Sequence, residues 1–487
     1  MALADLDADF DELLFLCRGA EATLIEAAHE IATAPLHEPT RRLLTRQLTS
    51  SRHRYGSVAE RVLSLRESAE QGTPTPALVD ELAAERALLA DLVRTEQGLA
   101  AAIAGAADWQ SPSFLHSTVP QAGRQNGRIR AHRNDYKRDR HLDADAYERR
   151  YVGAMLDGPA GVRALLTSCG MAAFTTILAF LSLERRLDGP VVAGAGLYHE
   201  SRLLLERALL GRVHLVDERD TRAVLRAIDK LRPRAVFLDS LSNTKWMPVP
   251  ELPPLLERLR GTSTYLVLDN TGLSVACQPF ALAGDSVRLI VFESLLKYAQ
   301  LGLDRANAGV IVARGEDVAA LAAYREHLGT NVADVAVHAL PRPNRQILAR
   351  RLGRLQRNAL VVASHLRARA GPAADVVYPG LRSHPGARTA RRLAFRGGCL
   401  SIVFRAGDSG LRRERALVEA AVAEAARHGV ALVGGSSFGF NTSRIYLTAA
   451  RAECGEPFVR IAAGAEHRLE LETLAAALAA ALDRVTR

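Results

Sequence analysis

The chain has 487 residues, of which 48% are hydrophobic and 24% are charged. This balance is typical of a large folded protein with two or three domains, and it excludes disorder over most of the chain. The formal charge is +9, yet 63 basic residues are opposed by 54 acidic ones spread along the same length. The composition therefore favours a basic surface that attracts anionic ligands over a nucleic-acid-binding protein.

Cysteine usage and the first residues point to a cytoplasmic protein. The five cysteines lie far apart without paired spacing, so the sequence predicts neither a disulfide framework nor a metal site. The N-terminus is acidic, whereas a secretory signal needs a positive start followed by an apolar run. No charge occurs from Ala164 to Leu183, but this stretch carries several Thr and Ser residues. We expect a buried helix with a polar beginning there, and no membrane partner.

Residues 1–110 are predicted to form a helical N-terminal extension. Leucine and alanine recur at helical spacing in residues 10–31 and 76–103, with a break at Gly72-Thr-Pro-Thr-Pro76. Residues 111–140 are rich in Arg, Gly, Gln and Asn and are predicted to form a basic arm or linker. Aromatic residues are sparse in the arm, so it does not predict a nucleic-acid site.

The remainder of the chain is predicted to form two α/β parts. In residues 141–345, short β-rich runs alternate with helices, which indicates a mostly parallel sheet covered on both faces. Residues 346–487 are predicted to form a smaller α+β domain. The expected strands are residues 191–195, 213–216, 235–239, 265–269, 288–292 and 308–313, and then 400–405, 431–433, 443–447 and 459–462. Helices are expected at 412–428 and 471–485.

Two of these strands lead to side chains that carry chemistry. Asp269 closes one strand, and Lys297 follows the next strand within a few residues. Since ligands of α/β proteins bind at the carboxyl ends of parallel strands, both side chains are expected at one site. A lysine that can form a Schiff base, together with a carboxylate, is the minimum equipment of pyridoxal phosphate chemistry.

An anion site is also predicted at the start of a helix. The segment Thr167-Ser-Cys-Gly-Met-Ala-Ala173 precedes an apolar helix, so the amides of Gly170 and Met171 can face a phosphate. Taken alone, such a segment is more often a helix start with small residues that packs on a sheet. Its meaning depends on the motifs around it.

Seven elements, including these, resemble in order those of the cysteine/methionine-metabolism family of pyridoxal phosphate enzymes, the relatives of cystathionine synthases and lyases and of methionine γ-lyase. The resemblance runs from about Tyr136 to the C-terminus. It implies fold type I, the aminotransferase-like α/β fold with a mostly parallel central sheet and a smaller α+β C-terminal domain. The helical N-terminal region is an addition to that fold.

The resemblance implies residues that hold the cofactor's phosphate. Tyr136-Lys-Arg138 resembles a Tyr-x-Arg element that reaches the phosphate in a neighbouring subunit, which implies a homodimer or homotetramer with shared active sites. In that family this tyrosine also lies near the substrate. Ser168-Cys-Gly170-Met171 resembles the phosphate cradle.

The resemblance also implies contacts to the cofactor's ring. Asn243 would bond the phenolic oxygen, and Asp269 in Asp269-Asn-Thr271 would keep the ring nitrogen protonated. Glu293-Ser294-Leu-Leu-Lys297 resembles the lysine motif, with a leucine in place of a threonine; Ser294 and Thr271 belong to the cofactor site.

Three further residues are implied to act on the substrate. Tyr198 would stack on the cofactor ring and serve as an acid or base. Arg460 would hold the α-carboxylate through two parallel hydrogen bonds. Ser437 lies in a segment that resembles the family's Ser-Leu-Gly stretch and is expected to line the substrate site.

The predicted activity is γ-elimination or γ-replacement on a γ-substituted L-amino acid, through an aldimine at Lys297 and a vinylglycine-type quinonoid. A pyridoxal-phosphate-dependent β-lyase or aminotransferase is one alternative, since sequence cannot separate these reactions. A non-catalytic scaffold or binding protein is the other. The presence of Lys297, Asp269, Arg460 and Tyr198 together argues against that second alternative.

Overall fold

A computed structural model describes residues 2–33, 36–72, 75–97, 142–157, 161–242, 244–405, 411–448 and 457–486. The predicted basic arm, with Tyr136 and Arg138, lies outside the described residues, as does Asn243. The predictions made for these three residues, and the division of the chain near residues 110, 140 and 345, stay predictions.

The central sheet has seven strands in the order β1-β7-β6-β5-β4-β2-β3. The run from β3 to β6 is parallel, and β7 lies antiparallel between β6 and β1. The mostly parallel α/β fold is therefore confirmed. The strands are β1 (Val162–Thr167), β2 (Val191–Gly194), β3 (Val213–Val216), β4 (Ala235–Asp239), β5 (Tyr265–Asp269), β6 (Arg288–Ser294) and β7 (Gly309–Arg314).

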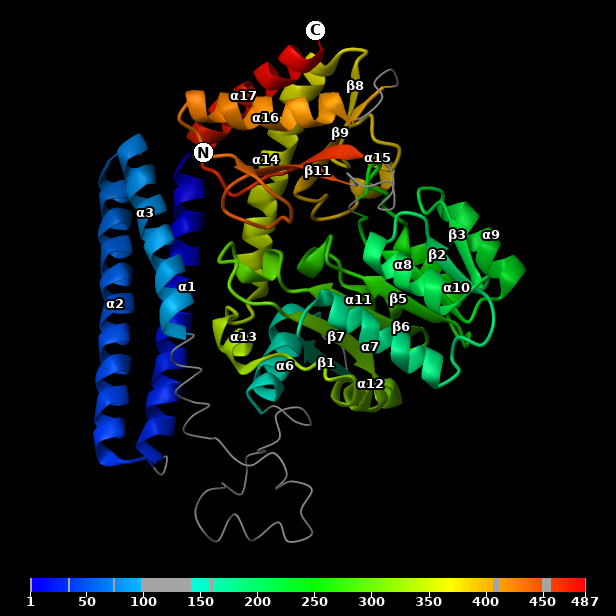
Figure 1. Ribbon diagram of the computed structural model, residues 1–487, viewed down its shortest axis with the longest axis horizontal. Coiled ribbons are helices and arrows are strands. Elements are labelled where there is room, and N and C mark those ends of the chain that lie inside the picture. Colours follow the sequence, from blue (N-terminus) through cyan, green and yellow to red (C-terminus); the bar gives the residue numbers. More distant parts are fainter. Residues whose placement is uncertain are drawn as a thin grey trace.

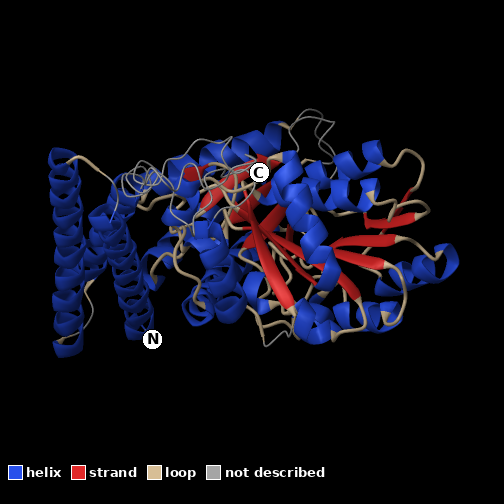
Figure 2. Ribbon diagram, turned by 90° about the horizontal axis from the view of Figure 1, so that it is seen from below, coloured by secondary structure: helices blue, strands red, loops and turns tan. Residues whose placement is uncertain are grey.

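Helices cover both faces of this sheet (Figure 2). On β4, Phe237 packs on one face against Phe174, with ring centroids 6.2 Å apart, while Val236 and Leu238 belong to the core on the other face. Burial on both faces explains why these strands are continuous apolar runs. The helices here are α6 (Leu142–Met155), α7 (Gly170–Leu183), α8 (His199–Ala208), α9 (Thr221–Leu231), α10 (Leu252–Leu259), α11 (Pro279–Ala283), α12 (Gly315–Leu328) and α13 (Asp334–Ala339).

The prediction of one buried helix from Ala164 to Leu183 is wrong in its first part. Residues Val162–Thr167 form β1, which pairs antiparallel with β7, and the helix begins only at Gly170. Cys169 caps this helix, because its Sγ accepts a hydrogen bond from the amide of Ala172 at 3.3 Å. The sequence pattern does not distinguish the strand from the helix, because both are buried and apolar.

A second sheet of five strands follows, in the order β10-β11-β12-β9-β8. It is antiparallel apart from the β10–β11 pair. Its strands are β8 (Ala374–Val377), β9 (Cys399–Phe404), β10 (Val433–Gly434), β11 (Arg444–Thr448) and β12 (Phe458–Ala462). The helices are α14 (Arg345–Ala370), α15 (Ala387–Ala390), α16 (Arg412–Arg427) and α17 (Arg468–Thr486).

The N-terminal region consists of long helices at one side of the molecule, beside α14 (Figure 1). They are α1 (Ala2–Thr33), α2 (Glu38–Gln71) and α3 (Pro76–Leu92), followed by a π-helical turn, η1 (Val93–Gln97). Helix α1 contacts both α2 and α14, so it connects this region to the rest of the protein. Among the described helices, none is long and apolar enough to cross a membrane.

Candidate active site

The carboxyl ends of β4, β5 and β6 bring several predicted residues together. Asp239 and Asp269 end neighbouring parallel strands and stand opposite each other in register. Lys297 follows β6 and precedes a short 3-10 turn, η3 (Tyr298–Gln300). Its Nζ lies 5.5 Å from the ring centroid of Phe438, which comes from the loop between β10 and β11. Both sheets therefore contribute to the site.

The environment of Lys297 favours the neutral amine. Burial lowers the pKa of Lys297, and the positive charge of Arg460 lowers it further, while Asp304 and Asp269 act in the opposite direction. Burial penalises the charged form of a lysine, which increases the fraction available as a nucleophile or base. This shift also shows that Arg460 and Asp269 are close enough to Lys297 to influence its charge.

Of the two strand-end aspartates, Asp239 is buried and Asp269 half-buried, and neither forms an ion pair with an arginine among the described residues. Burial raises the pKa of Asp269, although hydrogen bonds from Thr271 and the charge of Lys297 oppose the shift. Burial also raises the pKa of Asp239 well above its usual range, and the neighbouring Asp269 adds to the effect. One carboxylate oxygen of Asp239 has no hydrogen-bond partner. The site therefore carries acidic groups that a cation would complete.

The predicted phosphate-binding residues meet where the start of α7 touches the end of β6. A Cβ atom placed on Gly170 would lie 2.7 Å from the Cβ of Ser294, so only glycine fits there. The amide of Ser294 donates to the Oγ1 of Thr271 at 2.9 Å, which links β6 to the loop after β5. Met171 is the second residue of the helix, and Ser168 precedes the cap. The helix N-terminus and two hydroxyl side chains thus converge, as a phosphate site requires.

Tyr198 and Arg460 lie at the same site but arrive from different sheets. Tyr198 directly precedes α8 and keeps 46% of its surface exposed, which leaves its ring open to a ligand. Burial and the nearby Glu200 raise the pKa of Tyr198. Asp269 also raises it, whereas Arg460 lowers it. Arg460 lies on β12, and its guanidinium stands 5.8 Å from the ring centroid of Tyr446. No ion pair of Arg460 occurs within the described part of the chain.

Ser437 lies in a strained loop beside Lys297. Its backbone has φ of +74°, which a residue with a side chain rarely adopts, and its buried Oγ has no hydrogen-bond partner. Gly439, at φ of +91°, packs so closely that a Cβ there would lie 2.8 Å from the carbonyl carbon of Lys297. The loop that packs against Lys297 thus also carries a hydroxyl without a hydrogen-bond partner.

Three residues of this region have no role in the sequence-based prediction. Asp239 is buried at the end of β4, opposite Asp269 and close to the Tyr198 backbone. Glu293 is buried and accepts a hydrogen bond from Ser274 Oγ at 2.6 Å. Arg351, on α14, bonds the loop that carries Ser437. Strand-end position was a signal for the two acids, whereas nothing in the sequence marks Arg351.

At the carboxyl edge of the parallel sheet, a lysine lies beside carboxylates, and a helix N-terminus touches the end of β6 at a position where only glycine fits. This arrangement defines a fold type I pyridoxal phosphate enzyme. The described residues fit that cofactor, because the acidic groups lack a cation and the Ser437 hydroxyl lacks a partner. The profile of the family "Cys/Met metabolism PLP-dependent enzyme" matches residues 100–482. The chain belongs to this family. It is therefore a pyridoxal-phosphate-dependent enzyme of that family, which sets aside the scaffold alternative.

Known proteins resemble different extents of the chain. The bifunctional enzyme flvA of Aspergillus flavus is 28% identical over 329 residues, which are 66% of this chain and 39% of flvA. The chain thus spans well under half of that relative. Cystathionine γ-synthase of Xanthomonas oryzae pv. oryzae, solved with cystathionine, is 26% identical with a TM-score of 0.59, covering 74% of this chain and 89% of that one. Methionine γ-lyase CalE6 of Micromonospora echinospora, at 23% identity and a TM-score of 0.58 over 71% and 87% of the two chains, supports the fold.

Proposed function

We propose that the protein catalyses γ-elimination or γ-replacement on an L-amino acid that carries a leaving group at Cγ. One observation supports this most strongly: Asp269 and Arg460, which come from two different sheets, both act on the pKa of Lys297 and on that of Tyr198. Pyridoxal phosphate, when bound, supplies an electron sink for the charge that develops at the substrate Cα. In this proposal Lys297 holds it covalently, and Asp269 lies at its ring nitrogen. Ser168, Gly170, Met171, Thr271, Ser294 and Asn243 complete its site, with Tyr136 and Arg138 of a neighbouring subunit.

The side chains of the protein then divide the proton transfers. Arg460 binds the substrate's α-carboxylate and orients the bond between Cα and its hydrogen. Neutral Lys297 accepts the Cα proton and later moves a proton at Cβ, for which its lowered pKa suits it. Tyr198 donates a proton to the departing γ group; burial and the nearby Glu200 raise its pKa, so the hydroxyl is protonated when the substrate binds. Ser437 contributes its hydroxyl to the substrate site.

The closest alternative is β-elimination on a cysteine-like substrate, or transamination, with the same lysine. A panel of γ-substituted and β-substituted amino acids separates these reactions by product. Release of a four-carbon α-keto acid or of a γ-replacement product supports the proposal. A three-carbon keto acid from β-substituted substrates, with no turnover of γ-substituted ones, would replace it with the β-lyase.

Loading of the site is tested independently of the reaction. We expect purified protein with pyridoxal phosphate to show a visible absorption band that borohydride bleaches, and the label to be found at Lys297 by peptide mapping. Lys297→Ala should lack the label. Absence of the band in the wild type after addition of the cofactor would contradict the assignment of Lys297.

We also infer a cytoplasmic homodimer or homotetramer with active sites shared between subunits. The resemblance of Tyr136-Lys-Arg138 to an element that crosses a subunit interface supports this inference. Mixing inactive Lys297→Ala with inactive Arg138→Ala chains tests it. Recovery of activity in the mixture is expected for shared sites, and its absence after subunit exchange has been verified contradicts them.

A further inference from the structure

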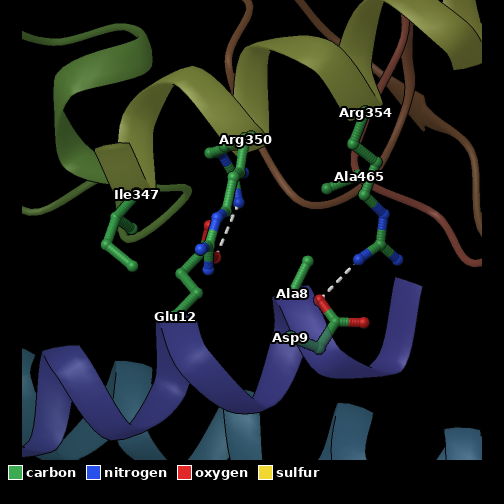
Figure 3. A pocket seen from close by; sticks show the side chains of 8 residues that line it. Ala8, Asp9, Glu12, Ile347, Arg350, Arg354 and Ala465 are labelled. Atoms are coloured by element: carbon green, nitrogen blue, oxygen red, sulfur yellow. Dashed lines mark hydrogen bonds and ion pairs between the residues drawn. The ribbon is translucent and has the colours of Figure 1, made fainter. Parts of the chain in front are cut away.

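Helix α1 is docked on α14 through a ladder of ion pairs. Acidic side chains of α1 point across the interface toward arginines of α14, as Figure 3 shows for Asp9 and Arg354. The pairs are Asp5–Arg357, Asp9–Arg354 (2.6 Å), Asp11–Arg350 (2.6 Å) and Glu12–Arg351 (2.9 Å). The paired residues lie far apart in the sequence, since Glu12 and Arg351 are separated by 339 residues. Three of these pairs join the two helices and do not reach the loop that carries Ser437.

The pair of Glu12 and Arg351 extends further than the others. One terminal nitrogen of Arg351, Nη1, donates to Glu12. The other, Nη2, donates to the carbonyl of Gly439 at 3.1 Å and to the Oδ1 of Asn441 at 2.9 Å. The Arg351 side chain is only 1% exposed, so water does not replace these partners. Its guanidinium therefore bridges the N-terminal helix and the loop between β10 and β11.

That loop and a second segment hold the backbone around Lys297. Gly439 packs against the carbonyl carbon of Lys297, as described above. Gly302 follows the 3-10 turn after Lys297 and has φ of +82°. A Cβ on Gly302 would lie 2.5 Å from Nη2 of Arg351 and would overlap Asn441. The Arg351 guanidinium thus contacts both the loop that packs on Lys297 and the segment that follows the 3-10 turn.

A buried guanidinium needs a counter-charge. Burial lowers the pKa of Arg351, and Glu12 is the main group that opposes this shift, while the neighbouring Arg86 and Arg354 add to it. Among the described residues, Glu12 is the carboxylate in contact with Arg351. Loss of that charge would leave Arg351 buried and unpaired, a state that favours rearrangement of the side chain and of whatever it holds.

We propose that Glu12 is a positioning residue: it holds Arg351 in the orientation that fixes residues 439–441 against the Lys297 turn. The N-terminal helical region thereby sets the geometry of the loop that carries Ser437, although it lies outside the catalytic fold. The part of this inference that concerns substrate rests on the proposed function. The part that concerns the loop does not, because loop order can be measured without any substrate.

Three full-length variants test the proposal. Glu12→Gln removes the charge but keeps the shape, and Arg351→Lys keeps a charge for Glu12 but lacks the planar fork that reaches the loop. Asp11→Asn is the matched control, because it neutralises a pair between the same two helices that does not reach the loop. Amide hydrogen exchange by mass spectrometry is followed in peptides that cover 435–448 and, as reference, in peptides of the central sheet.

We expect Glu12→Gln and Arg351→Lys to raise exchange at residues 437–441 about tenfold, the equivalent of one charge-assisted hydrogen bond, with the central sheet unchanged. Asp11→Asn should leave the loop at the wild-type rate. In the loaded enzyme the first two variants should raise KM more than they lower kcat.

Two results would overturn the proposal. One is equal exchange at the loop in Glu12→Gln and Asp11→Asn. The other is a uniform rise across the protein in both Glu12→Gln and Arg351→Lys, which would mean that the pair only docks α1. If the loop loosens as expected but no γ-substituted amino acid reacts, the positioning role stands and the proposed function fails.

Discussion

Two regions of this protein hold buried or half-buried carboxylates in opposite surroundings. At the α1–α14 interface, Asp9 and Glu12 each contact two arginines, with Arg86 shared between them. At the ends of β4, β5 and β6, Asp239, Asp269 and Glu293 lie near one another with no arginine partner among the described residues. Burial raises the pKa of each of these three acids.

The difference distinguishes an interface that docks one helix on another from a site that binds a reactive ligand. Paired charges at the helix interface neutralise each other, so they orient α1 on α14 without perturbing the fold. Unpaired acids at the strand ends cost free energy in the folded chain and are retained where a cationic ligand completes them. The following predictions test whether the two regions respond as differently as their surroundings require.

The largest expected effect is on catalysis, at the unpaired acids. Asp269→Asn should lower kcat by about 10²–10⁴-fold, because an amide does not stabilise a protonated ring nitrogen as a carboxylate does. Steady-state kinetics on the substrate identified from the panel measures this. The unfolding midpoint of the cofactor-free chain should not fall, since a buried ionisable group has been removed. A kcat within a few-fold of the wild type would contradict the role of Asp269.

The next effect is on stability, at a fully paired buried site. Glu148 and Arg325 form an ion pair at 2.6 Å, and both side chains are almost completely buried. Arg325→Met should lower the free energy of unfolding by about 3–5 kcal/mol, because it leaves a buried carboxylate unpaired. Urea titration measures the loss. The double variant Arg325→Met/Glu148→Gln should recover part of it, and no recovery would mean that packing rather than charge is responsible.

A pH-dependent effect is expected at Glu293, whose pKa burial raises to about 8. In the unfolded chain a glutamate has a pKa of about 4.3, so between these values the folded state binds a proton that the unfolded state has lost. Stability from this group is full below the lower value and falls by about 1.4 kcal/mol per pH unit across the window. Glu293→Gln should therefore be near neutral at pH 4.5 and stabilising at pH 9. Denaturant curves at both pH values test this, and an equal difference at both would contradict it.

The smallest effect is expected on the outer surface of the N-terminal helices. Arg61 on α2 and Glu85 on α3 form an ion pair in which the arginine side chain is 47% exposed. Glu85→Gln should lower the free energy of unfolding by less than about 1 kcal/mol, because water screens the pair. Urea titration beside Arg325→Met shows the contrast. A loss as large as that of the buried variant would mean that exposure does not control the strength of these pairs.

The strands of the central sheet were well predicted where they are buried on both faces. Residues 235–239 and 265–269 are such strands with the predicted bounds, because apolar runs between turn residues are typical of buried parallel strands. The edge strand at residues 213–216 also has its predicted bounds, although it is partly exposed. Strand β1 was missed because periodicity does not separate a buried strand from a buried helix that follows within three residues. Strand β8 was missed as well.

The sequence by itself determined the family and the cofactor, and it predicted the lysine and its acidic partner. These follow from residue type at the ends of strands, and such local order along the chain is retained in the fold. Only the tertiary structure decided which distant side chains share a site. Glu12, Arg351 and Gly439 come from three separate segments, and no local pattern connects them. Their contact exists because α1 packs on α14. No single segment of the sequence determines which distant helix it packs against.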